Sequence, residues 1–396
     1  MDITLNPRYL RGEIAIIPSK SIAHRLLICA AFSDKPTQLI CAETSRDMDA
    51  TADCLRALGA EILRTETGYT VFPVKQVPQT ALLPCGESGS TLRFLLPVVG
   101  ALGVDGTFRM EGRLPQRPLS PLWEEMERMG CILSRPTVDT IRCSGKMKPG
   151  AYSISGNVSS QYITGLMLAL SILGEPSTLK VTGSIESKPY IDITKDVLQQ
   201  FGVDPERLGS EKLCSPGYIT VEGDWSNGAF WMSANALGSD ILVTGLNYDS
   251  FQGDRMVMEI LPELSRGCPT VSAADIPDLV PILAIVAAAK HGAVFTDIRR
   301  LRLKESDRVA SVIAMIEALG GTAWATENTL TIAGTGLAGG TVDACNDHRI
   351  AMAASIGATV CKETVSILGA ECVSKSYPRF WEEYSRLGGN YEQYLR

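Results

Sequence analysis

The sequence predicts an α/β protein made of six similar units, arranged as two groups of three around buried helices. One observation is an amphipathic helix that ends near a glycine and is followed by a short β-like run. The other is an apolar helix that is polar only at its start. The two kinds of helix alternate with a period of about 65 residues, which is too long for common solenoids. Each unit is therefore expected to be strand, buried helix, strand, surface helix, strand, strand.

The amphipathic helices are recognised by their spacing and by their ends. A glycine suits a helix C-terminus because it adopts left-handed backbone angles without strain. The fifth copy is clearest, since Val309, Val312, Ile313, Ile316 and Leu319 fall on one helical face. The glycines that end the copies are Gly59, Gly130, Gly202, Gly267, Gly320 and Gly388.

The apolar helices are predicted to be buried because they carry no polar face. They span 19–32, 87–102, 159–173, 224–237, 276–289 and 346–359.

Composition narrows the class of protein. Of the 396 residues, 45% are hydrophobic and 20% charged, and the net charge is −7, which argues against general binding to nucleic acid or to anionic membranes. The longest apolar runs, 163–173 and 279–289, fall short of the roughly 20 residues that cross a bilayer. The 11 cysteines show no CxxC pair and no signal core precedes them, so we expect reduced thiols in a cytoplasmic protein.

Familiar metal and nucleotide motifs are absent from the sequence. Its three histidines, at 24, 291 and 348, lie far apart without HExxH spacing, and there is neither GxGxxG after a strand nor a Walker A loop. An anionic ligand would need local basic pockets.

The starts of the buried helices hold most of the candidate chemistry. Ser and Asp there are good N-caps, which is one reading. Cations at a helix N-terminus oppose its dipole, however, so capping does not explain Lys20, Arg25, Arg93 and Arg349. The other reading is a set of helix N-termini converging on anions. The residues in question are Lys20, Ser21, Arg25, Ser88, Gly89, Arg93, Ser159, Ser160, Gln161, Asp278, His348 and Arg349.

Further candidates lie in loops and charge clusters, and each could instead have a purely structural role. Arg117 stands in a Pro-rich loop where an arginine is usually solvated. Asp278 is either a cap or a carboxylate able to accept a proton. The cluster 299–308 is either a solvated ion-pair face or a glutamate placed between cations, Glu305 with Lys304 and Arg308. The remaining candidates are Ser187, Lys188, Tyr190, Asp275 and Lys375.

Taken together and in order, these blocks resemble the EPSP synthase family of enolpyruvyl transferases. The blocks are PSKSIAHR, GESGSTLR, the Arg-Pro at 117–118, GNVSSQ, SKPYID, DIPD, KESDR, NDHR and SKSYP. The resemblance covers nearly the whole chain. It implies a two-domain inside-out α/β barrel with three βαβαββ repeats per domain. The domains would be 18–222, and 1–17 plus 223–396, with the active site in the cleft between them.

The resemblance also implies an activity. The family joins shikimate 3-phosphate to phosphoenolpyruvate: the 5-hydroxyl attacks C2, a tetrahedral intermediate forms, and phosphate leaves. The product lies on the shikimate pathway to chorismate and the aromatic amino acids. No metal or organic cofactor is implied. We expect a monomer acting on these two small molecules, with glyphosate as an inhibitor at the phosphoenolpyruvate site.

Roles are transferred by position. Asp278 resembles the proton acceptor and Glu305 the proton donor, with Lys20 as a third catalytic residue. Arg308 and Arg349 would hold the phosphoenolpyruvate carboxylate. The shikimate 3-phosphate set is Lys20, Ser21, Arg25, Ser159, Ser160, Gln161, Ser187, Tyr190, Asp278 and Lys304. The phosphoenolpyruvate set is Lys20, Gly89, Arg117, Gln161, Arg308, Arg349 and Lys375.

Three positions depart from the family pattern, and three rivals stay open. Glu87 stands where many members have Asn, Arg300 where many have Asn, and Phe94 where many have Pro.

The nearest rival is the sister enzyme acting on UDP-N-acetylglucosamine. That enzyme typically has a reactive Cys in the loop that corresponds to 112–119, and this sequence has none there. The others are a noncatalytic anion-binding repeat protein and a nucleic-acid enzyme of related fold.

Overall fold

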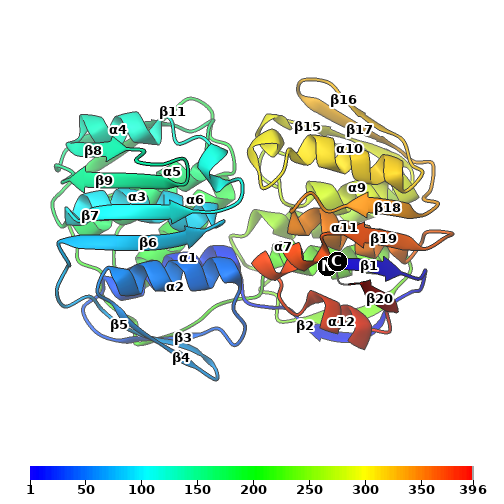
Figure 1. Cartoon of the computed structure of the whole chain (residues 1–396), viewed down its shortest axis with the longest axis horizontal. Coiled ribbons are helices and arrows are strands. Elements are labelled where there is room, and N and C mark those ends of the chain that lie inside the picture. The colour runs from blue at the N-terminus through cyan, green and yellow to red at the C-terminus, as the bar shows by residue number, and fades with distance from the viewer. Residues whose placement is uncertain (395–396) are drawn as a thin grey trace. The chain divides into compact units, whose positions relative to one another are not determined.

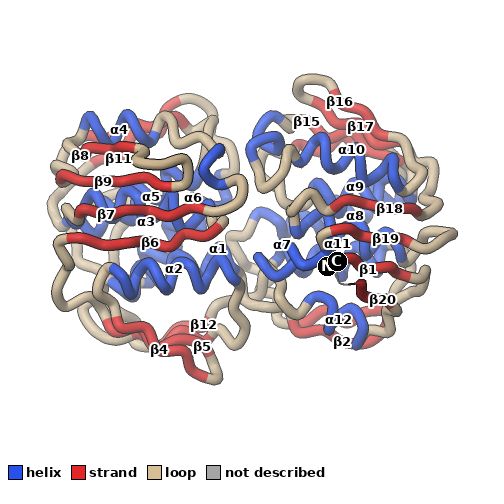
Figure 2. The backbone as a smooth tube through the Cα atoms, viewed as in Figure 1, coloured by secondary structure: helices blue, strands red, loops and turns tan. Residues whose placement is uncertain are grey.

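The computed structural model describes residues 1–394 and divides into two compact units (Figure 1). Unit 1 comprises Met1–Ile17 and Gly223–Arg396, and unit 2 comprises Pro18–Glu222. Both units have the same composition of apolar helices, amphipathic helices and short strands (Figure 2).

The six apolar segments form helices, as predicted, and their side chains are largely buried. In α9 every residue from Val280 to Ala288 is buried, which fits a helix without a polar face. The helices are α1 (Lys20–Ala31), α3 (Gly89–Leu102), α5 (Ser160–Leu173), α7 (Trp225–Ala236), α9 (Val280–Ala289) and α11 (His348–Ala358).

The amphipathic segments also form helices, each with one buried face. In α10 the buried side chains include Val309, Val312 and Ile316, as the spacing predicted, while Ile313 is only partly covered. These helices are α2 (Arg46–Ala57), α4 (Leu122–Arg128), α6 (Lys188–Gln200), α8 (Val257–Arg266), α10 (Arg308–Ala318) and α12 (Phe380–Arg386). Short 3-10 turns add η1 (Leu114–Gln116), η2 (Gly253–Met256), η3 (Arg299–Leu303) and η4 (Ala370–Lys375).

The glycines after the amphipathic helices behave as predicted, with one exception. Gly59 and Gly320 have φ values of 102° and 81°, a region that side chains disfavour. Gly267, which follows α8, is instead extended with φ of −177° and needs no glycine for that reason.

Unit 2 contains three sheets. One has the order β12-β3-β5-β4, the second β6-β7-β9-β8 and the third β10-β11. The strands are β3 (Thr37–Ile40), β4 (Glu61–Thr65), β5 (Gly68–Phe72), β6 (Thr80–Gly86), β7 (Asp105–Met110), β8 (Cys131–Ser134), β9 (Thr140–Gly145), β10 (Ala151–Ser155), β11 (Thr178–Thr182) and β12 (Tyr218–Thr220).

Unit 1 repeats this arrangement. Its sheets have the orders β18-β19-β1-β20, β14-β15-β17-β16 and β13-β2. The strands are β1 (Asp2–Leu5), β2 (Arg11–Ala15), β13 (Asp240–Thr244), β14 (Thr270–Ser272), β15 (Gly292–Thr296), β16 (Ala323–Ala325), β17 (Thr329–Ala333), β18 (Gly340–Asp343), β19 (Val365–Leu368) and β20 (Tyr391–Tyr394).

Strand pairing reveals the repeat. In each four-stranded sheet one edge pair is parallel, such as β6 with β7, and the other neighbours are antiparallel. Strand β1 completes a sheet of unit 1 by pairing with β19 and β20, which explains why the first residues belong there. The β10-β11 and β13-β2 sheets have only two strands among residues 1–394, so these repeats are shorter than the predicted pattern.

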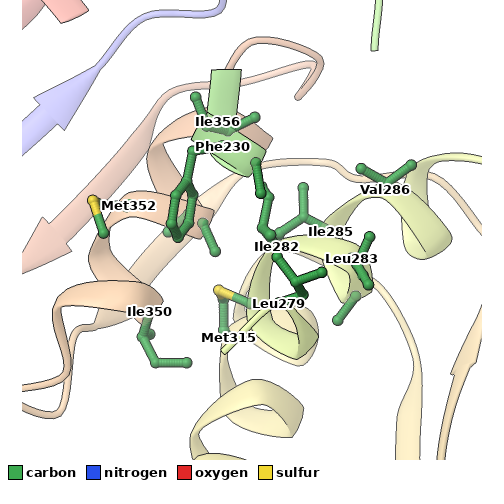
Figure 3. Packing of buried hydrophobic residues seen from close by; sticks show 14 of the residues in the cluster. Phe230, Leu279, Ile282, Leu283, Ile285, Val286, Met315, Ile350, Met352 and Ile356 are labelled. Atoms are coloured by element: carbon green, nitrogen blue, oxygen red, sulfur yellow. The ribbon is translucent and has the colours of Figure 1, made fainter. Parts of the chain in front are cut away.

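The buried helices pack on one another inside the sheets. In unit 2, α3 contacts α5 along much of its length, and α3 also contacts β6, β7 and β9. In unit 1, α9 contacts α11 and α7, and Figure 3 shows Phe230 of α7 beside Met352 and Ile356 of α11 and near Ile282 of α9. These cores are mainly apolar, and the charged side chains discussed below lie near the helix N-termini.

Candidate functional site

The predicted site residues fall into two groups, one in each unit. In unit 2 the helix starts are capped locally. Ser88 accepts a hydrogen bond from the backbone N–H of Thr91 at the start of α3, and Ser159 accepts one from that of Gln161 at the start of α5. Ser19, which precedes α1, makes no such side-chain cap.

Lys20, the first residue of α1, forms an ion pair with Asp47 of α2. The distance from Nζ to Oδ2 is 2.9 Å, and both side chains are less than one-fifth exposed. This pairing offsets the unfavourable placement of a cation at a helix N-terminus. The ammonium group belongs to the first residue of α1 and is tied to α2 by this ion pair.

Gly89, Arg117, Arg93 and Gln161 lie together at the opening of α3. A methyl group on Gly89 would lie 2.6 Å from Nη1 of Arg117 and 2.8 Å from Nη1 of Arg93, so the missing side chain lets both guanidinium groups approach the backbone. Arg93 donates to Oε1 of Gln161 at 2.8 Å. The Nε atom of Arg117 is buried and has no hydrogen-bond partner within residues 1–394, which is uncommon for a buried donor.

Arg25 is 1% exposed and is anchored within the protein. Its guanidinium donates to Thr194 at 2.8 Å, to Thr164 at 3.2 Å and to the carbonyls of Tyr190 and Ser21. Burial lowers its pKa to about 9, which still leaves it charged near neutrality. Within residues 1–394 these four acceptors take four of the five N–H hydrogens of the guanidinium.

The other predicted residues of unit 2 occupy two helix openings. Ser160 is buried, whereas Ser159 and Gln161 are partly exposed. Ser187 precedes α6 with φ of 55°, a left-handed conformation that is uncommon for serine, and is buried. Tyr190 lies in the first turn of α6 and is partly exposed.

In unit 1, Asp278 lies among three cations. Its Oδ1 accepts from Nη1 of Arg308 at 2.7 Å and from Nζ of Lys304 at 3.4 Å, and its Oδ2 accepts from Nη2 of Arg349 at 2.9 Å. Burial alone would raise the pKa of Asp278, but Arg349, Lys304 and Arg308 outweigh it and hold this pKa well below its usual range. Asp278 is therefore a carboxylate at neutral pH.

Arg308 is fully buried and joins three carboxylates. Besides Asp278, it donates to Glu305 at 2.7 Å through Nη2 and to Asp347 at 3.0 Å through Nε. Asp347, also fully buried, caps α11 by accepting from the backbone N–H of Arg349. The carboxylates raise the pKa of Arg308 against the opposing effect of burial, while burial lowers the pKa of Lys304.

Two further predicted residues border this cluster. Lys375, in η4, is 8% exposed and donates to the carbonyl of Asn346 at 2.9 Å. His348 is buried in the first turn of α11. Unit 1 thus brings together Asp278, Lys304, Glu305, Arg308 and Arg349 directly.

Comparison with known proteins identifies the family. The sequence pattern of the EPSP synthase (3-phosphoshikimate 1-carboxyvinyltransferase) family matches residues 5–270 and 268–384. The chain belongs to the EPSP synthase family. It is 36% identical to the 3-phosphoshikimate 1-carboxyvinyltransferase of Clostridium kluyveri and 36% identical to that of Clostridium acetobutylicum, covering 99% of this chain and 98% of each relative.

Solved EPSP synthase structures show the same fold. Two structures of the enzyme from Acinetobacter baumannii superpose with TM-scores of 0.80 and 0.81 at 22% and 21% identity. They cover 99% and 100% of this chain and 100% of each solved chain. Together with the alternation of helices and sheets, this establishes the two-domain α/β fold of the EPSP synthases.

Sequence reasoning missed residues that support the site. Asp47 pairs with Lys20, Asp347 holds Arg308, and Asp254 lies buried within the electrostatic reach of Asp278. Only Asp347 gave a signal, because it stands at the N-cap position within the NDHR block. The other two lie outside the motifs, at the start of α2 and in η2.

Among residues 1–394, no helix is both long enough and apolar enough to span a membrane.

Proposed function

We propose that this chain transfers the enolpyruvyl group of phosphoenolpyruvate to the 5-hydroxyl of shikimate 3-phosphate and releases phosphate. Membership of the EPSP synthase family and near full-length similarity to 3-phosphoshikimate 1-carboxyvinyltransferases support this activity. The hydroxyl oxygen bonds to C2 while its proton leaves and the methylene carbon gains one. The tetrahedral intermediate then loses phosphate and a methyl proton, which restores the double bond.

Unit 1 supplies the acid–base pair in this proposal. Asp278 accepts the hydroxyl proton, and Glu305 protonates the methylene carbon and later takes a methyl proton back. Asp278 is a weak base while three cations surround it. An anionic substrate that binds Arg308, Arg349 and Lys304 partly neutralises their positive charge. This raises the pKa of Asp278, so Asp278 becomes a stronger base when the substrate binds.

Unit 2 supplies binding groups. The groups assigned to shikimate 3-phosphate are Lys20, Ser21, Arg25, Ser159, Ser160, Gln161, Ser187 and Tyr190. Lys20 also serves phosphoenolpyruvate, with Gly89, Arg117 and Gln161. Arg117, with an unpartnered Nε and with Nη1 beside Gly89, suits a phosphate oxygen, since guanidinium and backbone N–H groups both donate to anions. In unit 1, Lys375, Arg308 and Arg349 complete the phosphoenolpyruvate set and Lys304 the shikimate set.

The observation on which the proposal chiefly depends is that Asp278 and Glu305 share one buried guanidinium, each at 2.7 Å. Carboxylates beside the cations of an anion site weaken anion binding by like-charge repulsion, so two of them at this position favour a role in proton transfer. Asp278 also pairs with Lys304 and Arg349, so the two carboxylates lie in different electrostatic surroundings, which suits a base and an acid.

Phosphate release tests the proposal. Purified protein is mixed with both substrates, and then with each one omitted in turn. Phosphate that appears only with both substrates, and that stops when shikimate 3-phosphate is replaced by UDP-N-acetylglucosamine, supports the assignment. Release with the UDP-sugar instead would assign the chain to the sister reaction, and release with neither acceptor would end the proposal.

A further inference from the structure

A line of buried polar side chains connects three helices of unit 2. Nδ1 of His24 in α1 lies 2.7 Å from Oγ1 of Thr51 in α2, which lies 2.7 Å from Oγ1 of Thr91 in α3. Oγ1 of Thr91 lies 2.7 Å from Oγ of Ser88, the N-cap of α3. None of the four residues is more than 1% exposed, so solvent does not compete for these bonds.

The directions of the hydrogen bonds follow from the proton count. Thr91 donates its only hydroxyl hydrogen to Ser88, and its second neighbour, the carbonyl of Asp47 at 3.3 Å, can only accept. Thr91 must therefore accept from Thr51. Because the Thr51 hydrogen is used in that bond, Thr51 must in turn accept from His24.

This chain of donors fixes the state of His24. The ring carries its hydrogen on Nδ1 and leaves Nε2 as an unprotonated acceptor. Burial, with further contributions from Lys20 and Arg25, lowers the pKa of His24 well below its usual value, so the ring is neutral. Nε2 is buried and has no hydrogen-bond partner within residues 1–394.

The network joins two openings that the proposed function uses. His24 lies one helical turn after Lys20, and Ser88 immediately precedes Gly89. Asp47, whose carbonyl faces Thr91, is also the ion-pair partner of Lys20. Any shift of Thr51 would therefore be transmitted to α1 on one side and to α3 on the other.

We propose that Thr51 is a positioning residue: by accepting from Nδ1 of His24 and donating to Thr91, it fixes the histidine tautomer and holds the first turn of α1 in register with the opening of α3. The effect on substrates rests on the proposed function, because it requires that Lys20 and Gly89 bind them. The tautomer does not depend on that function.

The tautomer is tested first, in the unmodified protein. Histidine is labelled with ¹⁵N and the two-bond correlations of the His24 ring are recorded near neutral pH, with a His24→Asn variant for assignment. We expect Nδ1 to give the signal of a protonated nitrogen and Nε2 that of an unprotonated one. A proton on Nε2, or on both nitrogens, would overturn the proposal without reference to any activity.

Variants test the positioning role. Thr51→Val is nearly isosteric and removes both hydrogen bonds, Thr51→Ser retains both, and Thr37→Val is the matched control. Thr37 is equally buried in unit 2, but it bonds to Ser215 instead. We expect Thr51→Val to weaken substrate binding about fivefold, because the first turn of α1 and the opening of α3 lose their link, with a smaller change in kcat.

The comparison separates positioning from general stability. Thr37→Val should lower the denaturation midpoint in the same way as Thr51→Val but leave both substrate dissociation constants unchanged, and Thr51→Ser should restore binding. Equal dissociation constants for Thr51→Val, Thr37→Val and the unmodified protein would contradict the role. Failure of the unmodified protein to release phosphate would contradict the proposed function, while the histidine spectrum would still decide the tautomer.

Discussion

Arg308 donates to Asp278 through Nη1 at 2.7 Å, and the side chain of Arg308 is fully buried. The same guanidinium also pairs with Glu305 and Asp347, so one cation contacts three carboxylates. A buried ion pair is costly to break from one side, because the remaining charges lose their partner while staying away from water.

Replacing Arg308 by Met should destabilise the protein by about 3–5 kcal/mol, since it leaves Asp278 and Asp347 with fewer compensating charges inside unit 1. Chemical denaturation measures this loss. Arg302→Met on η3 is the control, because Arg302 is partly exposed and its ion pair with Asp307 is long, at 3.7 Å. Equal denaturation midpoints for the two variants would show that Arg308 contributes no more to stability than an exposed arginine.

Glu305→Gln should reduce turnover by about 10²–10⁴-fold, the usual contribution of a general acid, while shikimate 3-phosphate still binds. Gln keeps the size of the side chain and can still accept from Arg308, so the fold should persist. The control is Glu317→Gln, an exposed position on α10, the helix that begins three residues after Glu305. Turnover close to that of the control would remove Glu305 from the acid role.

Asp254 should give unit 1 a pH-dependent stability of opposite sign to most carboxylates. Burial, with repulsion from Asp278, raises its pKa to about 7, although Arg349 and Ser226 oppose this. Between the unfolded pKa near 3.8 and about 7 the folded state holds the extra proton, so stability from this group falls as pH rises through that window. It is fully present below the unfolded pKa and lost above the folded one.

Urea denaturation across pH 4–8 measures this effect in the unmodified protein and in Asp254→Asn. The Asn variant can accept from Ser226, as Asp254 does, but cannot ionise. We expect the decline in the unfolding free energy toward pH 7 to become shallower in the variant. Identical pH profiles would mean that Asp254 does not titrate in this range.

The sequence predicted the parts of the fold that depend on local pattern. The apolar segments form buried helices, because a helix that is apolar on all sides is unfavourable in water; α9 is an example. The two-stranded sheets β10-β11 and β13-β2 were not foreseen, since the helix and strand pattern predicts elements but not which strands pair. Family motifs supplied the candidate residues that chemistry alone left undecided.

The contacts within the site were less predictable. Nothing in the sequence pairs Lys20 with Asp47, or Arg308 with Asp347, because these partners are far apart along the chain and meet only through packing of helix ends. Likewise, Arg25 was expected as a ligand clamp, and its bonds to Thr164, Thr194 and the Tyr190 carbonyl emerge only from the folded unit 2. Hydrogen bonds formed on folding therefore determine how many N–H donors of Arg25 are available to a ligand.

Arg117→Ala should weaken phosphoenolpyruvate binding by about 10–100-fold, the effect of losing a hydrogen bond to a charged group, and shikimate 3-phosphate binding far less. Arg117 Nε has no partner within residues 1–394, so its removal costs few internal contacts. Gly89→Ala should act in the same direction, because its methyl group would lie 2.6 Å from Arg117 Nη1 and displace that side chain. Calorimetric titration of each substrate into each variant measures both constants. A control is Arg113→Ala in the same loop, at an exposed position. Equal weakening for the two substrates would assign Arg117 to a general electrostatic role, and an unchanged phosphoenolpyruvate constant would remove it from the site.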